Sequence, residues 1–194
     1  MPLTLHHPDG QVFDFDPGAL CLELSSATGG EGFRARFETL HGPRDVARWS
    51  AESRFGAPVR ASAADLRDLK DLREALWAAA YAVATGGEPP DTAVATINAY
   101  AAGPAPVPRL DGDVATWRAP VGGAQLVTAV ARDAIHTFSR PTRDRIRMCQ
   151  GVNCYLIYLD TSRGGGRRWC SMQRCGNRNK VRAFREREAD PSQS

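Results

Sequence analysis

No apolar run in these 194 residues approaches the roughly 18 positions that a bilayer-spanning helix requires, so we expect no membrane segment. The opening stretch, MPLTLHHPDG, also lacks the basic segment and apolar core of a secretory signal. We therefore expect a cytoplasmic protein, in a compartment that keeps cysteines reduced. The composition, 42% hydrophobic and 24% charged, is that of a globular chain.

Cysteine is scarce over most of the chain, and a single one, Cys21, precedes residue 149. The other four form two evenly spaced pairs, Cys149/Cys154 and Cys170/Cys175, each with the spacing C-x4-C. Two such pairs can place four thiolates around one ion, so the spacing predicts a single structural zinc ion. Disulfide pairing is the alternative, which a reducing compartment and the odd number of cysteines disfavour. Cys21 lies in the apolar stretch GALCLEL, where we expect a buried thiol.

Histidine is absent from the cysteine-rich segment, because all four histidines precede it: His6, His7, His41 and His136. A zinc nuclease needs histidine as base or ligand and an open position on the metal, whereas four sulfur ligands close the coordination shell. The sequence therefore predicts a structural metal ion and no enzymatic activity.

Acidic residues are scarce near the end of the chain, where residues 140–188 carry thirteen lysines and arginines against four carboxylates. Residues 1–139 show the reverse balance, with twelve basic and seventeen acidic side chains. A basic segment that coincides with a metal-binding pattern is typical of a module that binds nucleic acid. The alternative is a solvated basic surface.

Helical periodicity dominates the first 140 residues. The clearest helix begins after Ser62, which can form a capping box with Asp65, and its apolar stripe includes Leu69, Leu72 and Leu76. Weaker patterns predict a hairpin, or a strand leading into a helix, over 1–24, an extended connector over 103–113 and a strand over 114–119. Further helices are expected after Gly42-Pro43, after Pro89-Pro90 and over 124–139.

The cysteine-rich segment is too short to fold on apolar burial alone. We predict a strand over 155–159, a reversal at Gly164–Gly166 and a returning strand over 167–170 that delivers Cys170. Cys175 then opens a helix over 177–187. A β-hairpin followed by a helix around four ligands is typical of a treble clef, and a structural zinc ion can contribute about 10 kcal/mol to the folding of such a module.

Basic side chains surround the second cysteine pair. We predict that six of them contact nucleic acid: Arg167, Arg168, Arg178, Lys180, Arg182 and Arg185. On the same helix Val181 and Phe184 are expected to pack back on the hairpin beside Trp169. The alternative is a solvated helix on which Glu186 and Glu188 pair with some of the arginines.

These elements predict an α+β fold in two domains. Residues 1–140 form a mainly helical domain with a few short strands, and Pro141 breaks the last helical pattern. Residues 141–188 form a treble-clef-like zinc finger, built from a β-hairpin and a helix, and residues 189–194 a disordered tail.

The motif of the finger reads R-x-C-x4-C-x5-D-x-S-R and then R-R-W-C-S-M-x-x-C-G-N-R-x-K, from Arg147 to Lys180. It closely resembles the CGNR zinc finger, named for the tetrapeptide that spans residues 175–178 here. Upstream, the resemblance is to the ABATE domain that precedes this finger, and it is carried by GALCLEL, residues 45–49, residues 66–80 and Ile97-Asn98. The sequence departs from that family at residues 22–27, LELSSA, where the pattern usually reads L-D-F-x-N-T.

The resemblance implies a stress-induced transcriptional regulator, in which one zinc ion holds a finger that binds DNA. The ABATE-like domain, residues 1–140, would sense a small-molecule effector or form a homodimer. An RNA-binding or protein-interaction module with a purely structural zinc site is the alternative that the residues leave open.

Overall fold

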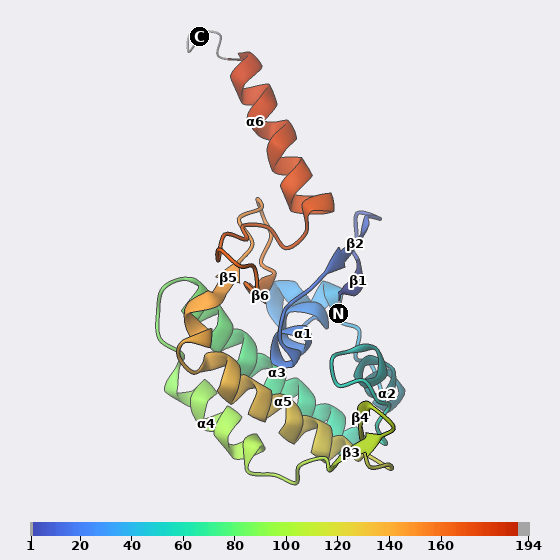
Figure 1. Cartoon of the computed structure of the whole chain (residues 1–194). Helices are drawn as coiled ribbons and strands as arrows, with labels where there is room; N and C mark the ends of the chain where they lie inside the picture. The colour runs from blue at the N-terminus through green and yellow to red at the C-terminus, as the bar shows by residue number, and fades with distance from the viewer. Residues whose placement is uncertain (1, 190–194) are drawn as a thin grey trace.

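Four helices form the centre of the molecule, and the computed structural model describes residues 2–189 (Figure 1). The helices are α1 (Leu20–Ala27), α3 (Ala63–Ala84), α4 (Asp91–Ala101) and α5 (Gly123–Phe138), and each packs against at least two of the others. Leu69, Leu72 and Leu76 recur on one side of α3 and are fully buried. This apolar stripe is the one that the sequence predicts.

The helix α3 begins at the predicted cap. The Ser62 hydroxyl accepts the Asp65 N–H at 3.2 Å, and the Asp65 carboxylate accepts the Ser62 N–H at 2.7 Å. The other three predicted helices are confirmed as α2 (Pro43–Glu52), α4 and α5. Between α1 and α2 the chain adds a short 3-10 helix, η1 (Gly32–Phe37).

A short hairpin joins α4 to α5. Its strands, β3 (Pro108–Asp111) and β4 (Val114–Trp117), pair antiparallel. β4 confirms the strand expected over 114–119, and the connector expected over 103–113 is more ordered than predicted, because part of it forms β3. The physical reason is the two-residue turn at Gly112-Asp113, where Gly112 adopts a φ of +61° and lets the chain reverse.

The N-terminal hairpin packs against the cysteine-rich segment, which is distant in sequence. β1 (Leu3–His6) pairs antiparallel with β2 (Val12–Phe15) ahead of α1, as expected. Phe13 and Phe15 are buried in one cluster with Tyr158, Cys149, Cys170 and Cys175. The first residues of the chain therefore complete the core of the finger.

The β-hairpin of the finger differs from the predicted one. β6 (Ile157–Leu159) pairs with β5 (Ile146–Met148), whereas residues 167–170 form no strand. The first cysteine pair lies in the short connection between β5 and β6, so these strands meet at a smaller loop-closure cost than a pairing with residue 167 would need. The predicted returning strand is wrong, and the treble clef stays a prediction.

The buried core continues from the helices into the finger. Ile146 of β5 and Ile157 of β6 belong to the same cluster as the leucines of α1 and α3. At Gly18 the chain comes so close to β6 that an added Cβ would lie 2.7 Å from the Leu159 carbonyl oxygen. The division expected at Pro141, just ahead of the 3-10 helix η2 (Thr142–Arg145), stays a prediction, and side-chain packing is continuous across it.

The last helix, α6 (Asn177–Ala189), follows a π-helical turn, η3 (Met172–Gly176), that contains Cys175. It projects away from the rest of the molecule (Figure 1). Val181 is 50% exposed and Phe184 is 55% exposed, so the expected packing on the hairpin beside Trp169 is wrong, because η3 directs the helix off the surface. Ala189, expected in the tail, belongs to α6, and residues 190–194 of that tail lie outside the described residues.

The predicted α+β class is confirmed, since helices predominate and the strands form three two-stranded antiparallel sheets in the described part of the chain. Within residues 2–189, no helix combines the length and apolar character that crossing a bilayer demands.

Candidate metal centre

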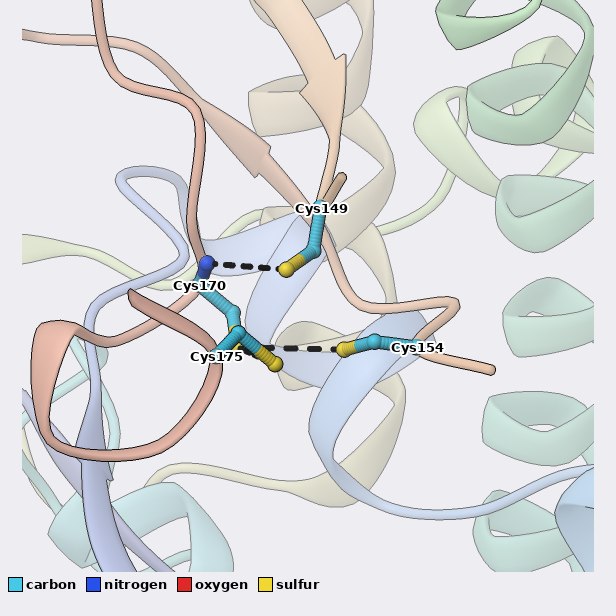
Figure 2. Close-up of side chains that lie close together, drawn as sticks. All are labelled: Cys149, Cys154, Cys170 and Cys175. Atoms are coloured by element: carbon cyan, nitrogen blue, oxygen red, sulfur yellow. Dashed lines mark hydrogen bonds between the residues drawn. The ribbon is translucent and has the colours of Figure 1, made fainter. Parts of the chain in front are cut away.

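The two cysteine pairs come together at one point, where the Sγ atoms of Cys149, Cys154, Cys170 and Cys175 all lie within 4.8 Å of one another (Figure 2). Cys154 is half-buried and the other three are buried. The sulfur of Cys170 lies 3.8 Å from that of Cys154 and 3.6 Å from that of Cys175. A tetrahedral zinc ion with Zn–S bonds of about 2.3 Å holds its sulfurs about 3.8 Å apart, so the four residues fit this ion.

All five cysteines are free thiols, and Cys21 is fully buried among apolar side chains, as expected. The sulfur separations at the centre are far longer than the disulfide bond of about 2.05 Å. The disulfide alternative therefore finds no support, and the finger carries a site for one structural zinc ion.

The turn between Cys149 and Cys154 is shaped for the ligands. The Cys149 sulfur accepts N–H groups from Gly151 at 3.4 Å and from Cys170 at 3.2 Å. An added Cβ at Gly151 would lie 2.6 Å from the Cys175 sulfur, so glycine is needed here for space. Asn153 adopts a φ of 56°, a left-handed conformation that asparagine tolerates better than most residues.

The Cys149 thiol has surroundings that favour the charged thiolate, which is the form that binds a cation. Hydrogen bonds from Cys154, and then from the other two thiols, lower the pKa of Cys149. Zinc would displace the remaining thiol protons, because the ligand form of cysteine is the thiolate. Four sulfurs leave no open position, so the ion would hold the fold and would not bind a substrate.

Arg167 ties the second cysteine pair to the N-terminal segment. Its guanidinium donates to the carbonyl oxygens of Trp169 at 3.0 Å, Asp16 at 2.8 Å and Cys170 at 2.6 Å. It also lies over the Tyr158 ring, 3.9 Å from the centroid. Three of its five N–H donors are therefore used inside the protein, and the nucleic-acid contact expected at Arg167 stays a prediction.

Asp160 holds the loop that replaces the predicted returning strand. This buried carboxylate accepts the N–H of Ser162 at 2.9 Å, the Ser162 hydroxyl at 2.6 Å and the N–H of Arg167 at 3.0 Å. Burial opposes ionisation of Asp160, but these hydrogen bonds outweigh it and lower its pKa. The Asp and Ser of the motif are therefore structural.

The remaining basic residues named from the sequence are exposed: Arg168, Arg178, Lys180, Arg182 and Arg185. Arg168 donates to the Gln150 side chain at 2.8 Å, and Arg178 to the carboxylate of Asp9 at 2.9 Å. Four of the five lie on α6, whereas Arg168 lies beside the metal centre.

Sequence reasoning missed Arg174 and its partner on the N-terminal hairpin. Arg174 is buried, contacts the Asp9 carboxylate at 3.4 Å and donates to the Gln11 side chain at 3.0 Å. Its guanidinium also lies 5.1 Å from the centroid of the Phe13 ring. A contact across more than 160 residues leaves no local pattern, so no sequence signal marked it.

The comparisons with known proteins match these two parts of the chain. A family model described as "Putative stress-induced transcription regulator", ABATE, matches residues 18–141. A second, described as the CGNR zinc finger, matches residues 145–188. The search among curated proteins returned no match.

Proposed function

We propose that this chain, which belongs to the ABATE family and carries a CGNR zinc finger, is a cytoplasmic transcriptional regulator that binds duplex DNA through α6. Both matched families are of regulator or zinc-finger type, and we propose no catalytic role. The finger would supply the DNA contacts, and the helical region would sense a small molecule or form a homodimer.

The observation that carries this proposal is the basic helix α6, which projects from the molecule beyond its first turn, where Arg178 contacts Asp9 (Figure 1). Arg178, Arg182 and Arg185 are four and three residues apart, so they share one side of the helix. A single helix of this kind fits the major groove of B-DNA, where arginines pair with phosphates and base edges. Lys180 and Arg168 extend the cationic surface.

The test is fluorescence anisotropy of the zinc-loaded chain with a duplex DNA probe, a single-stranded DNA probe and a single-stranded RNA probe, each at two salt concentrations. Duplex binding should weaken with salt by about 0.9 in log K per log salt for every phosphate contacted. The double variant Arg182→Gln/Arg185→Gln should reduce this slope by up to about 1.8.

The matched control is Arg67→Gln, which removes an exposed arginine of α3 in the helical region. Its slope should equal that of the unaltered chain. A duplex affinity that is insensitive to salt, or that falls equally in both variants, would contradict the proposal.

A protein-interaction module is the second candidate, because Val181 and Phe184 are half exposed on α6. Exposed apolar side chains on a projecting helix are typical of a surface that docks on another protein. Binding to none of the three probes, together with loss of a defined partner on Phe184→Ser, would favour this candidate over DNA binding.

A further inference from the structure

A large cavity lies between the N-terminal hairpin and the finger. Its volume is about 840 Å³, which is within the range of small-molecule sites. The wall combines β1, η1 and α2 with residues 151–156 of the finger and with the first turns of α6. A molecule bound here would therefore touch both the helical region and the finger.

Three aromatic rings of the wall keep surface that a ligand can reach. Phe33 is 49% exposed, Tyr155 is 42% exposed and Trp77 is half-buried, and all three line the cavity. The Phe33 ring centroid lies 4.7 Å from that of Tyr155 in the finger and 6.1 Å from that of Trp77 on α3. The rings form one accessible group, and such a group marks a binding surface for a flat, apolar partner.

The cationic groups of the wall are largely neutralised. The arginines that line the cavity are Arg34, Arg36, Arg48, Arg174, Arg178 and Arg182. Asp9 contacts Arg174 at 3.4 Å and Arg178 at 2.9 Å. Arg48 pairs with Asp45 at 2.8 Å, and Arg34 pairs with Glu74. Four of the six guanidinium groups therefore already have a carboxylate partner.

The other two arginines are also engaged. Arg36 lies over the Phe37 ring, 4.7 Å from the centroid, and Arg182 has an interaction with another group of the chain. The exposed carboxylate of Glu52 lines the same wall and would repel an anion. An anionic ligand would have to replace an existing partner of an arginine, because burying a charge without a counter-charge costs free energy. The wall therefore favours an uncharged ligand.

Uncharged polar groups remain to orient such a ligand. The side chains of Asn153 and Asn179 line the cavity, one from the first cysteine turn and one from α6. Each amide offers both a donor and an acceptor. A wall of apolar rings with a few polar groups is typical of a small-molecule site.

We propose that the cavity binds an uncharged, planar aromatic molecule, which lies against the rings of Phe33, Trp77 and Tyr155. This molecule is the effector that the helical region senses in the proposed function, and the inference rests on that function for its effect on DNA.

The cavity shares part of its wall with the proposed DNA surface. Arg178 and Arg182, which are predicted DNA contacts on α6, both line it. A ligand in the cavity occupies the side of α6 that these two arginines share, so ligand and duplex compete for it. The ligand therefore weakens DNA binding, and by linkage DNA weakens ligand binding equally.

Fluorescence titration of the zinc-loaded chain with two matched probes tests the ligand class without DNA. N-phenyl-1-naphthylamine is uncharged, and 8-anilinonaphthalene-1-sulfonate adds one sulfonate to the same rings. The uncharged probe should bind about tenfold more tightly, because burying the sulfonate costs free energy. No binding of the uncharged probe, or a sulfonate that binds equally or more tightly, would overturn the proposal.

Variants locate the site. The double variant Phe33→Leu/Tyr155→Leu keeps apolar side chains at two partly exposed positions but removes both rings, and it should weaken the uncharged probe about tenfold. The control is Phe184→Leu, because Phe184 is 55% exposed on α6 and does not line the cavity. Unchanged affinity in the double variant, or an equal loss in the control, would overturn the assignment.

Anisotropy with a labelled DNA duplex then tests the competition, and saturating N-phenyl-1-naphthylamine should raise the Kd for DNA severalfold. An unchanged Kd in the presence of bound probe would overturn the competition. The two proposals fail separately, because probe binding without any DNA binding would contradict only the regulator, and DNA binding without probe binding would contradict only the cavity ligand.

Discussion

The helical region buries leucine and alanine, whereas the finger buries sulfur and aromatic rings. In the first, the leucines of α1, α3 and α5 make one extended cluster. In the second, three cysteines share a small cluster with Phe13, Phe15 and Tyr158. Apolar burial contributes about 25 cal/mol per Å², so the larger cluster can hold helices together while the smaller one needs a metal ion. One chain therefore uses two sources of stability.

The two regions nevertheless depend on one another. Ile146 and Ile157 carry the helical core into the finger, and the N-terminal hairpin brings Phe13 and Phe15 to the metal centre. Loss of the metal ion should therefore also destabilise residues that precede Pro141.

The largest expected effect is that of Cys170→Ser, which removes one zinc ligand. Without the ion the finger loses about 10 kcal/mol of folding free energy, so residues 146–189 and the hairpin of residues 3–15 should lose their protection against hydrogen exchange. The helices α3 and α5 should keep part of their protection, because most of their buried leucines pack on one another, although they lose their contacts with Ile146 and Ile157.

The matched control is Cys21→Ala, which removes the buried cysteine of α1 and should leave zinc content unchanged. If Cys170→Ser removed the protection of α3 to the same extent as that of the finger, the helices would depend on the metal ion as strongly as the finger does, which would contradict the comparison.

A smaller effect is expected for Ile157→Ala, which cuts a side chain of the finger that lies in the helical core. Removing such a side chain costs about 2–4 kcal/mol, and both regions should lose this stability together in one urea transition. Val152→Ala, at a position that is 67% exposed in the neighbouring turn, should change stability by less than about 0.5 kcal/mol. Separate transitions for finger and helices would contradict the shared core.

The smallest effect is a pH dependence confined to the helical region. Burial raises the pKa of Glu23 to about 7, although the Arg54 N–H at 2.8 Å and its guanidinium favour the carboxylate. The folded chain therefore keeps a proton that the unfolded chain releases above about pH 4.5, and stability falls as pH rises from 4.5 to 7.

The substitution Glu23→Gln removes the titrating carboxyl group and with it this loss of stability at higher pH. Relative to the unaltered chain, the variant should gain about 2–3 kcal/mol between pH 5 and pH 8, measured as free energies of unfolding in urea. Taking the difference at each pH cancels the effect of protons on zinc binding. A constant difference across this range would mean that Glu23 does not titrate as described.

The parts of the molecule that depend on local sequence signals could be predicted from the sequence. The capping box at Ser62 and Asp65 and the spacing of Leu69, Leu72 and Leu76 are local, and α3 follows them. The metal ligands could also be predicted, because each cysteine pair has a short C-x4-C spacing, and the four sulfur atoms lie together in the structure.

The rest depends on contacts between distant segments. The pairing of β5 with β6, the docking of β2 on the finger and the contact of Arg174 with Asp9 join residues whose own sequence carries no mark of the partner. Arg167 illustrates the limit most clearly, because its hydrogen bond to the carbonyl oxygen of Asp16, about 150 residues earlier, leaves no mark in the basic run.

The claim that a zinc ion stabilises the finger is tested most directly by elemental analysis of the purified, folded chain together with a count of its thiols. One zinc ion per chain, with five reduced cysteines after denaturation in a chelator, is the predicted result. A well-folded chain that holds no metal, or that yields disulfides between residues 149 and 175, would contradict it.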